Sequence, residues 1–435
     1  MRIVKFIICY NNLMDRDKNN KLFDKNFLWG ASTASHQVEG RTENQWSVWE
    51  LENANHLSKH PDRKLKKLSN WEEIKPKAEN PANYVSGEGV DHYRRFKEDF
   101  DLAKSLNLNS FRFGIEWSRI EPEEGLWNQK EIDHYHEYID ELIARGIKPI
   151  LNLWHWTMPT WFTDMGGFVK SSNVKYFDKF TTKIIQEYGH KLEYIITINE
   201  PNVYASYSYL LGTWPPQTKN PFTYVRVMVN LVKAHKNAYR IIKSMNDKIQ
   251  VGVANQVGNI QAKRPHNIFD EVATKIMRYL WNWWYYERIR NYQDFVGMNY
   301  YFTDYYYGIF IKKNPEYPNN DLGWYMEPEG LYPIILRAWT RFKKPIIITE
   351  NGLADSKDEY RRWWIEESII AMEKAISEGV DVRGYMHWSL LDNFEWAYGW
   401  WPEFGLIHVD RKNNMKRTVR PSAIWYADKI KQLRK

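Results

Sequence analysis

The segment Tyr194–Pro201, with the sequence YIITINEP, decides the fold of this chain. Its apolar, β-branched run predicts a buried strand, yet the run ends in the carboxylate of Glu200. The segment Pro345–Gly352, with the sequence PIIITENG, ends its apolar run in the same way at Glu350. Ionised carboxylates are rarely buried unless they are paired, so two such endings do not serve stability alone. We expect two parallel strands whose terminal carboxylates face each other across the open end of a barrel.

Six more apolar, β-rich segments recur along the chain, with helical segments between them. The eight predicted strands are 27–33, 110–117, 148–156, 194–200, 249–255, 294–301, 345–350 and 384–390. Apolar residues at helical spacing mark 91–106, 131–145, 173–189, 222–245, 332–342 and 359–378. Eight strands that alternate with helices predict an α/β protein with a single (β/α)8 barrel, the TIM barrel, whose catalytic face lies at the carboxyl ends of the strands.

The chain has 435 residues, of which 43% are hydrophobic, and no Gly/Ser- or Pro-rich linker divides it. We therefore expect an N-terminal extension over residues 1–22 and one catalytic domain over residues 23–435. The first ten residues are only faintly similar to a signal peptide, because Lys5 interrupts their apolar run and polar residues follow it. The single cysteine, Cys9, rules out an intrachain disulfide and fits a reducing compartment, so we expect a cytoplasmic protein.

Charge and motif content limit the expected partners. The net charge of +7 is spread along the chain, and the Lys-rich stretch at 57–78 is more typical of a solvated loop than of a nucleic-acid site. No apolar run approaches the roughly 18–20 residues of a membrane span. No metal-ligand spacing, phosphate-binding loop or nucleotide fingerprint appears. We expect no nucleic acid, membrane, cofactor or metal as a partner, and the sequence leaves a homo-oligomer open.

Aromatic and polar residues favour a carbohydrate as the ligand. The 22 Trp and 29 Tyr offer flat platforms for the C–H face of a sugar ring. The predicted strand ends carry Arg112, Glu116, His155, Trp156, Asn199, Glu200, Asn299, Tyr301, Glu350 and Trp388. Each of them taken singly has an ordinary structural explanation, such as core packing or an ion pair. Groups compatible with a sugar at nearly every strand end are hard to explain by packing alone.

Cleavage of a glycosidic bond needs one carboxylic acid that protonates the leaving oxygen and one carboxylate that faces the anomeric carbon. Partial burial at the end of an apolar strand favours the protonated form of Glu200. Arg112 is a candidate cation to hold Glu350 ionised, and Tyr301 is a candidate hydrogen-bond donor to the same carboxylate. On chemistry alone, the roles of the two glutamates remain interchangeable.

Five motifs in combination resemble glycoside hydrolase family 1, a family of retaining β-glucosidases and β-galactosidases. They are FLWGASTASHQVEG at 27–40, FRFGIEWSRI at 111–120, NEP at 199–201, TENG at 349–352 and WSLLDNFEW at 388–396. The resemblance runs from about Phe27 to Ile430 and implies that Glu200 is the general acid/base and Glu350 the nucleophile. One region departs from the family, because the connection at 256–293 is shorter than in most members. A more open cleft on the aglycone side is our hypothesis there.

The resemblance also implies a sugar-binding pocket. Positions that hydrogen-bond sugar hydroxyls are matched by Gln37, His155, Asn199, Glu395 and Trp396, the platform beneath the ring by Trp388, and the shell around the nucleophile by Arg112, Asn299 and Tyr301. Trp156 and Phe404 complete the expected substrate-binding set. The presence of Glu395 argues against a phosphorylated sugar because two anions in contact repel, and the presence of Glu200 argues for O-glycosides.

The sequence thus predicts a retaining β-glycosidase that removes terminal non-reducing sugars from small β-glycosides or oligosaccharides through a glycosyl-enzyme intermediate. The expected separation of the two carboxyl groups is about 5–5.5 Å. A transglycosylase shares this intermediate and remains an alternative. A sugar-binding pseudoenzyme is a third interpretation, disfavoured because both carboxylates are present.

Overall fold

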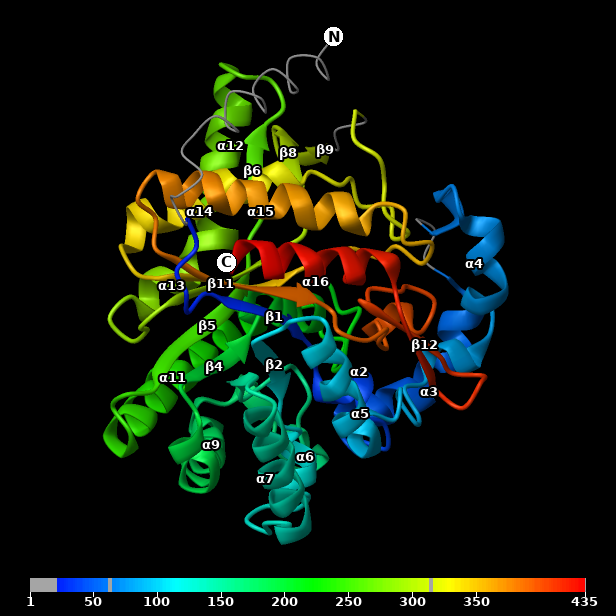
Figure 1. Ribbon diagram of the computed structural model, residues 1–435, viewed down its shortest axis with the longest axis vertical. Coiled ribbons are helices and arrows are strands. Elements are labelled where there is room, and N and C mark those ends of the chain that lie inside the picture. Colours follow the sequence, from blue (N-terminus) through cyan, green and yellow to red (C-terminus); the bar gives the residue numbers. More distant parts are fainter. Residues whose placement is uncertain (1–21, 62–64, 313–315, 435) are drawn as a thin grey trace.

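The computed structural model describes residues 22–61, 65–312 and 316–434, so the expected extension lies outside the described residues except for Leu22. Eight parallel strands close into a barrel in chain order (Figure 1). They are β1 (Leu28–Ser32), β2 (Ser110–Gly114), β3 (Lys148–Asn152), β4 (Tyr194–Asn199), β5 (Gln250–Gln256), β7 (Val296–Tyr300), β10 (Ile346–Asn351) and β11 (Val382–Trp388). β1 closes the barrel on β11, with Ser32 opposite Trp388. The predicted (β/α)8 barrel and its eight strands are confirmed.

Helices link the strands and surround the barrel (Figure 1). The six predicted helices correspond to α5 (His92–Ser105), α7 (Gln129–Ala144), α9 (Val174–Tyr188), α11 (Pro221–Met245), α14 (Leu331–Phe342) and α15 (Arg361–Ser377). α11 starts where the side chain of Asn220 accepts hydrogen bonds from the backbone of Phe222 and Thr223. Further elements are α2 (Ser35–Val38), α3 (Gln45–Lys59), α4 (Trp71–Ala78), α6 (Trp117–Ile120), α8 (Thr160–Asp164), α10 (Pro201–Ala205), α16 (Pro421–Leu433), β12 (Ile407–Asp410) and β13 (Lys416–Val419).

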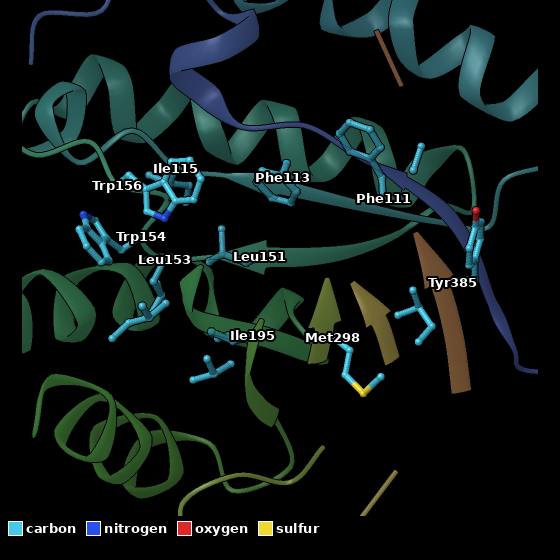
Figure 2. Close-up of a cluster of buried hydrophobic side chains, with 14 of the residues drawn as sticks. Phe111, Phe113, Ile115, Leu151, Leu153, Trp154, Trp156, Ile195, Met298 and Tyr385 are labelled. Carbon is cyan, nitrogen blue, oxygen red and sulfur yellow. The ribbon is translucent and has the colours of Figure 1, made fainter. Parts of the chain in front are cut away.

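A strand directs alternate side chains to opposite faces. One hydrophobic cluster therefore lies inside the barrel, and a second lies outside it, between the strands and the helices. Ile150 and Ile196 belong to a cluster with residues from most of the strands, which is the barrel interior. Their neighbours Leu151 and Ile195 belong to the larger cluster between the strands and the helices. Figure 2 shows part of that larger cluster, with Phe111 and other aromatic side chains packed along the strands. This close packing fixes the strand ends that carry the polar residues.

The connection between β5 and β7 forms a small substructure of its own. It contains β6 (Asn259–Ala262), α12 (Ile268–Arg278), a five-residue π-helical turn (Tyr279–Trp283) and α13 (Trp284–Ile289). β6 pairs with β8 (Thr303–Tyr307), which pairs with β9 (Phe310–Lys312) in a three-stranded sheet. α12 and this sheet stand at one end of the longest axis of the molecule (Figure 1). Across the described residues, every helix falls short of the length and apolar character that crossing a bilayer requires.

Candidate active site

The carboxyl ends of the barrel strands bring most of the expected site residues to one face. The strands themselves supply Arg112 from β2, Asn199 from β4, Asn299 from β7, Glu350 from β10 and Trp388 from β11. Residues just beyond the strand ends add His155 and Trp156 after β3, Glu200 after β4 and Tyr301 after β7. Glu200 and Glu350 are only 5% and 4% exposed. Both carboxyl groups are therefore sheltered from water at the catalytic face of the barrel.

Two donors hold the carboxylate of Glu350. The guanidinium of Arg112, which is fully buried, donates a close hydrogen bond to Oε1. The hydroxyl of Tyr301 donates to Oε2 at 2.7 Å. Hydrogen bonds from a cation to a carboxylate are about twice as strong as those between neutral groups. Glu350 is therefore fixed in orientation, with a positive charge directly beside it.

Glu200 has a different environment. Its Oε1 accepts a hydrogen bond of 2.8 Å from the side-chain amide of Asn299, whose own carbonyl accepts one of 2.6 Å from Thr349. Burial, followed by the negative charge of Glu350, raises the pKa of Glu200 well above its ordinary value. Its backbone lies in the left-handed region at φ +40°, which is sparsely populated by residues other than glycine. Burial and the neighbouring charge therefore both favour the protonated form of Glu200.

One chain of hydrogen bonds joins the two glutamates. Arg112 donates to Glu350 and, with its other amino group, to Oδ1 of Asn199 at 2.6 Å. The same oxygen accepts from Asn299 at 3.2 Å, and Asn299 donates to Glu200. The Asn199 amide lies 3.0 Å from Nε2 of His155. Burial and the nearby Arg112 lower the pKa of His155 well below its ordinary value, so this ring is neutral.

Gln37 and Glu395 form a second polar group beside the first. The Gln37 amide donates to the backbone carbonyl of Phe394 at 2.7 Å and reaches Oε2 of Glu395 at 3.4 Å. Asn393 donates to the same oxygen at 3.0 Å. Burial raises the pKa of Glu395 to about 7, an effect that Asn393 opposes. Oε1 of Gln37 is buried and accepts no hydrogen bond from the described residues, so this atom is available to a ligand hydroxyl.

Aromatic rings lie beside these polar groups. The ring of His155 lies 5.9 Å from Trp388 and 6.0 Å from Trp396, measured between ring centroids. Trp156 lies 4.8 Å from Trp396. Phe404 is 1% exposed and belongs to the same hydrophobic cluster as Trp388. The arrangement provides flat apolar surfaces next to hydrogen-bonding groups, which is what a sugar ring requires.

Glu116, another predicted strand-end residue, is a structural anchor. Its carboxylate accepts hydrogen bonds from the hydroxyls of Ser35, Ser118 and Thr157 at 2.9–3.0 Å. It takes no part in the chain that joins Glu200 and Glu350 among the described residues. Three hydroxyl donors satisfy the buried charge of Glu116, which explains a carboxylate there without a catalytic role.

Sequence reasoning assigned no role to two residues that orient the site, Thr349 and Asn393. Thr349 lies in the TENG motif at 349–352 and donates a hydrogen bond to Asn299. Asn393 lies in the WSLLDNFEW motif at 388–396 and donates a hydrogen bond to Glu395. Their position in these motifs was the available signal. Gly352, at the end of the motif at 349–352, was also assigned no role. A side chain does not fit at this position, because a Cβ atom would lie 1.9 Å from the backbone oxygen of Trp388.

One cluster of metal-ligand type exists in the described part of the chain. Asp392, Glu403 and His408 have ligand atoms within 4.8 Å of one another. The guanidinium of Arg420, however, bonds to Asp392 at 2.8 Å and to Glu403 at 2.7 Å. A resident cation thus already balances the two carboxylates, and the cluster does not fit a metal ion.

A closed (β/α)8 barrel with two sheltered carboxyl groups on its catalytic face, one of them with a raised pKa and the other paired with an arginine, defines the class of glycoside hydrolases.

Comparison with known proteins gives the family. The family described as Glycosyl hydrolase family 1 matches residues 19–289 and 284–434. β-Glucosidase A of Thermotoga maritima is 30% identical, over 95% of this chain and 98% of its own. β-Galactosidase of Sulfolobus acidocaldarius is 29% identical, over 93% and 94%. A solved β-glycosidase from Pyrococcus horikoshii is 33% identical, covers 93% of this chain and 94% of its own, and has a TM-score of 0.81. The chain belongs to glycosyl hydrolase family 1. It is an O-glycoside hydrolase with the retaining mechanism typical of that family.

Proposed function

We propose that this enzyme removes the terminal non-reducing sugar from small β-glycosides or oligosaccharides, with Glu350 as the nucleophile and Glu200 as the acid/base. The observation that carries this assignment is the difference between the two carboxyl groups. Glu350 is paired with Arg112, whereas burial raises the pKa of Glu200. A nucleophile must be ionised and a general acid must hold a proton, so the two environments fit opposite roles.

In the first half of the reaction, a carboxylate oxygen of Glu350 attacks the anomeric carbon. The bond from that carbon to the leaving oxygen breaks, and the proton of Glu200 passes to this oxygen. The product is a sugar joined to Glu350 by an ester bond, together with the free aglycone alcohol. Tyr301 and Arg112 point their donors at the two oxygens of Glu350 and hold it in line for the attack.

In the second half, water attacks the anomeric carbon and gives a proton to Glu200, while the bond to Glu350 breaks. Glu350 carries no charge in the intermediate, so the repulsion that helped to raise the pKa of Glu200 is absent. Glu200, which has already given its proton to the leaving oxygen, therefore stays ionised after the ester forms and is ready to act as the base. The same change explains how one residue serves first as acid and then as base.

The test uses two variants and aryl β-glucosides. Glu350→Ala should abolish hydrolysis, and added azide should restore turnover with an α-glycosyl azide as the product. Glu200→Ala should spare substrates with good leaving groups more than poor ones in the first step. Near-normal activity of Glu350→Ala, or equal losses on both kinds of substrate for Glu200→Ala, would overturn the assignment.

For the sugar itself, we propose an unphosphorylated glycone such as glucose or galactose. The Gln37 amide lies 3.4 Å from Oε2 of Glu395, and the ring of Trp388 lies 5.9 Å from that of His155. These distances support our proposal that Gln37 and Glu395 bond neighbouring hydroxyls and that Trp388 is the platform beneath the ring. The names of the β-glucosidase and β-galactosidase relatives support the same substrate class. A panel of aryl β-glycosides that differ only in the sugar would rank the glycones, and a preference for 6-phosphorylated sugars would refute the proposal.

We also propose that the enzyme is cytoplasmic and that residues 23–435 form one domain. The single cysteine supports the location. The contacts of the C-terminal helix support the proposal of a single domain. Tyr426 of α16 packs against Trp29 of β1 and Tyr385 of β11, with ring centroids 6.4 and 6.1 Å apart. Activity secreted into the medium of the source cells would contradict the location. A separately folding proteolytic fragment would contradict the single domain.

A further inference from the structure

Helix α12 carries its apolar side chains on the outside. Its buried residues are the polar Asp270 and Thr274. The exposed apolar side chains of the helix and the turn that follows it are Ile268, Phe269, Val272, Ile276, Tyr279 and Leu280. Phe269 is 75% exposed, although a surface helix normally turns such residues toward the core. The helix thus presents an apolar stripe to the surroundings of the protein.

The hairpin of β8 and β9 extends this stripe. Its tip exposes Tyr307, Ile309, Phe310 and Ile311, and Ile309 is 81% exposed. Asp270 fixes the hairpin to the start of α12, because its Oδ1 accepts from the backbone N–H of Gly308 at 2.8 Å. Arg264 bonds to both oxygens of Asp270 and lies 3.8 Å from the ring centre of Tyr307. We name the ten exposed residues of α12, its turn and the hairpin the apolar tip.

The surroundings of the apolar tip are basic. Residues 263–280 and 304–312 include five basic side chains, Lys263, Arg264, Lys275, Arg278 and Lys312. The acidic side chains in the same segments are three, Asp270, Glu271 and Asp304. Asp270 is already neutralised by Arg264, and the three lysines are exposed. Tyr279 and Tyr307, with an apolar ring and a polar hydroxyl, suit the boundary between lipid and water. Figure 1 shows α12 and the sheet of β8 projecting at one end of the molecule.

We propose that the apolar tip binds the surface of a lipid bilayer that contains anionic phospholipids. Ile268, Phe269, Ile309 and Phe310 enter the boundary between headgroups and acyl chains, and the lysines face the phosphates. An exposed apolar helix face with a basic rim has the chemistry of an interfacial contact. A second copy of the chain fits less well, because a projecting tip offers little flat area and two basic rims repel.

Contacts connect the base of the apolar tip to the active site. The apolar tip rises from the end of β5, where the indole N–H of Trp281 bonds to Gln256. Gln256 lies opposite Asn299, the residue that donates to Glu200. The sequence-based expectation of no membrane partner rested on the lack of a spanning segment, and an interfacial contact requires none.

Co-sedimentation of the full chain with vesicles tests the inference. The probes are vesicles of phosphatidylcholine with and without phosphatidylglycerol. We expect binding to the vesicles with phosphatidylglycerol, weakened by added salt, and binding about tenfold or more weaker for Ile309→Ser/Phe310→Ser. Leu51→Ser on α3, which is 68% exposed and distant from the apolar tip, is the matched control and should bind like the wild type.

All variants should keep the wild-type kcat/KM on a soluble aryl β-glycoside, which shows that they are folded. The inference fails if the wild type does not bind the vesicles with phosphatidylglycerol, or if the double variant binds as tightly as the wild type. It also fails if light scattering shows a dimer that the double variant converts to a monomer, because the apolar tip is then an interface between two copies of the chain.

Discussion

Replacement of Arg112 by methionine tests how strongly the active site depends on its buried ion pair. Arg112 is 0% exposed and Glu350 is 4% exposed, so solvent screens their interaction little. Removing one partner of a buried pair typically costs about 3–5 kcal/mol, because the other charge stays buried without compensation. Methionine fills a similar apolar volume and carries no charge. We therefore expect Arg112→Met to lower the free energy of unfolding by about 3–5 kcal/mol.

The double variant Arg112→Met/Glu350→Gln separates the charge effect from packing. It removes both charges, so it should be more stable than Arg112→Met alone, and the two single effects should not add. Urea unfolding followed by tryptophan fluorescence measures the free energies. Arg41→Met is the matched control, since Arg41 and Glu88 form an exposed pair, for which we expect a change of about 0–1 kcal/mol. A change below about 1 kcal/mol for Arg112→Met, or additive effects in the double variant, would refute the reasoning.

Three further predictions concern other parts of the structure. Because the pKa of Glu200 is raised mainly by burial, kcat/KM should fall as the pH rises through this raised value, and Glu200→Ala should remove that basic limb of the pH profile. A persistent limb in the variant would assign it to another group. Gly352→Ala should lower the Tm, since overpacking costs about 1–3 kcal/mol, whereas Gly258→Ala, whose Cβ would meet its nearest atom at 3.6 Å, should change it little. Hydrogen bonds that His408 donates to the carboxylates of Asp392 and Glu403 raise its pKa to about 9. The resulting stabilisation is complete below the unfolded pKa of roughly 6.5 and is lost as the pH rises through about 9, so the Tm of wild type and His408→Gln should converge at high pH.

The sequence predicted the barrel well because its strands are short apolar runs with clear ends. Each of the eight predicted segments overlaps an observed strand, and the segment that begins at Tyr194 matches β4 from its first residue. Helix α12, in the connection after β5, was not predicted from the sequence. α12 directs polar residues inward and apolar residues outward, so its periodicity alone gives no indication of which side faces the protein.

The site could be predicted as a set of residues but not as a network. Strand-end position and the motifs brought Glu200, Glu350 and Arg112 into the set. The second bond of Arg112, to Asn199, depends on side-chain geometry between two strands that no local pattern encodes. Strand-end position alone does not distinguish a catalytic carboxylate from Glu116, whose partners include the hydroxyls of Ser35 and Thr157. The predicted carboxyl separation of about 5–5.5 Å stays a prediction.

The central claim is that Glu350 forms the covalent bond to the sugar while Glu200 moves the proton. The most direct measurement is to trap the glycosyl-enzyme with a 2-deoxy-2-fluoro-β-glucoside that carries a good leaving group, then to digest the enzyme and map the labelled peptide by mass spectrometry. We predict one label per chain, on Glu350. A label on Glu200, or turnover of the trapping reagent without any covalent adduct, would contradict this account.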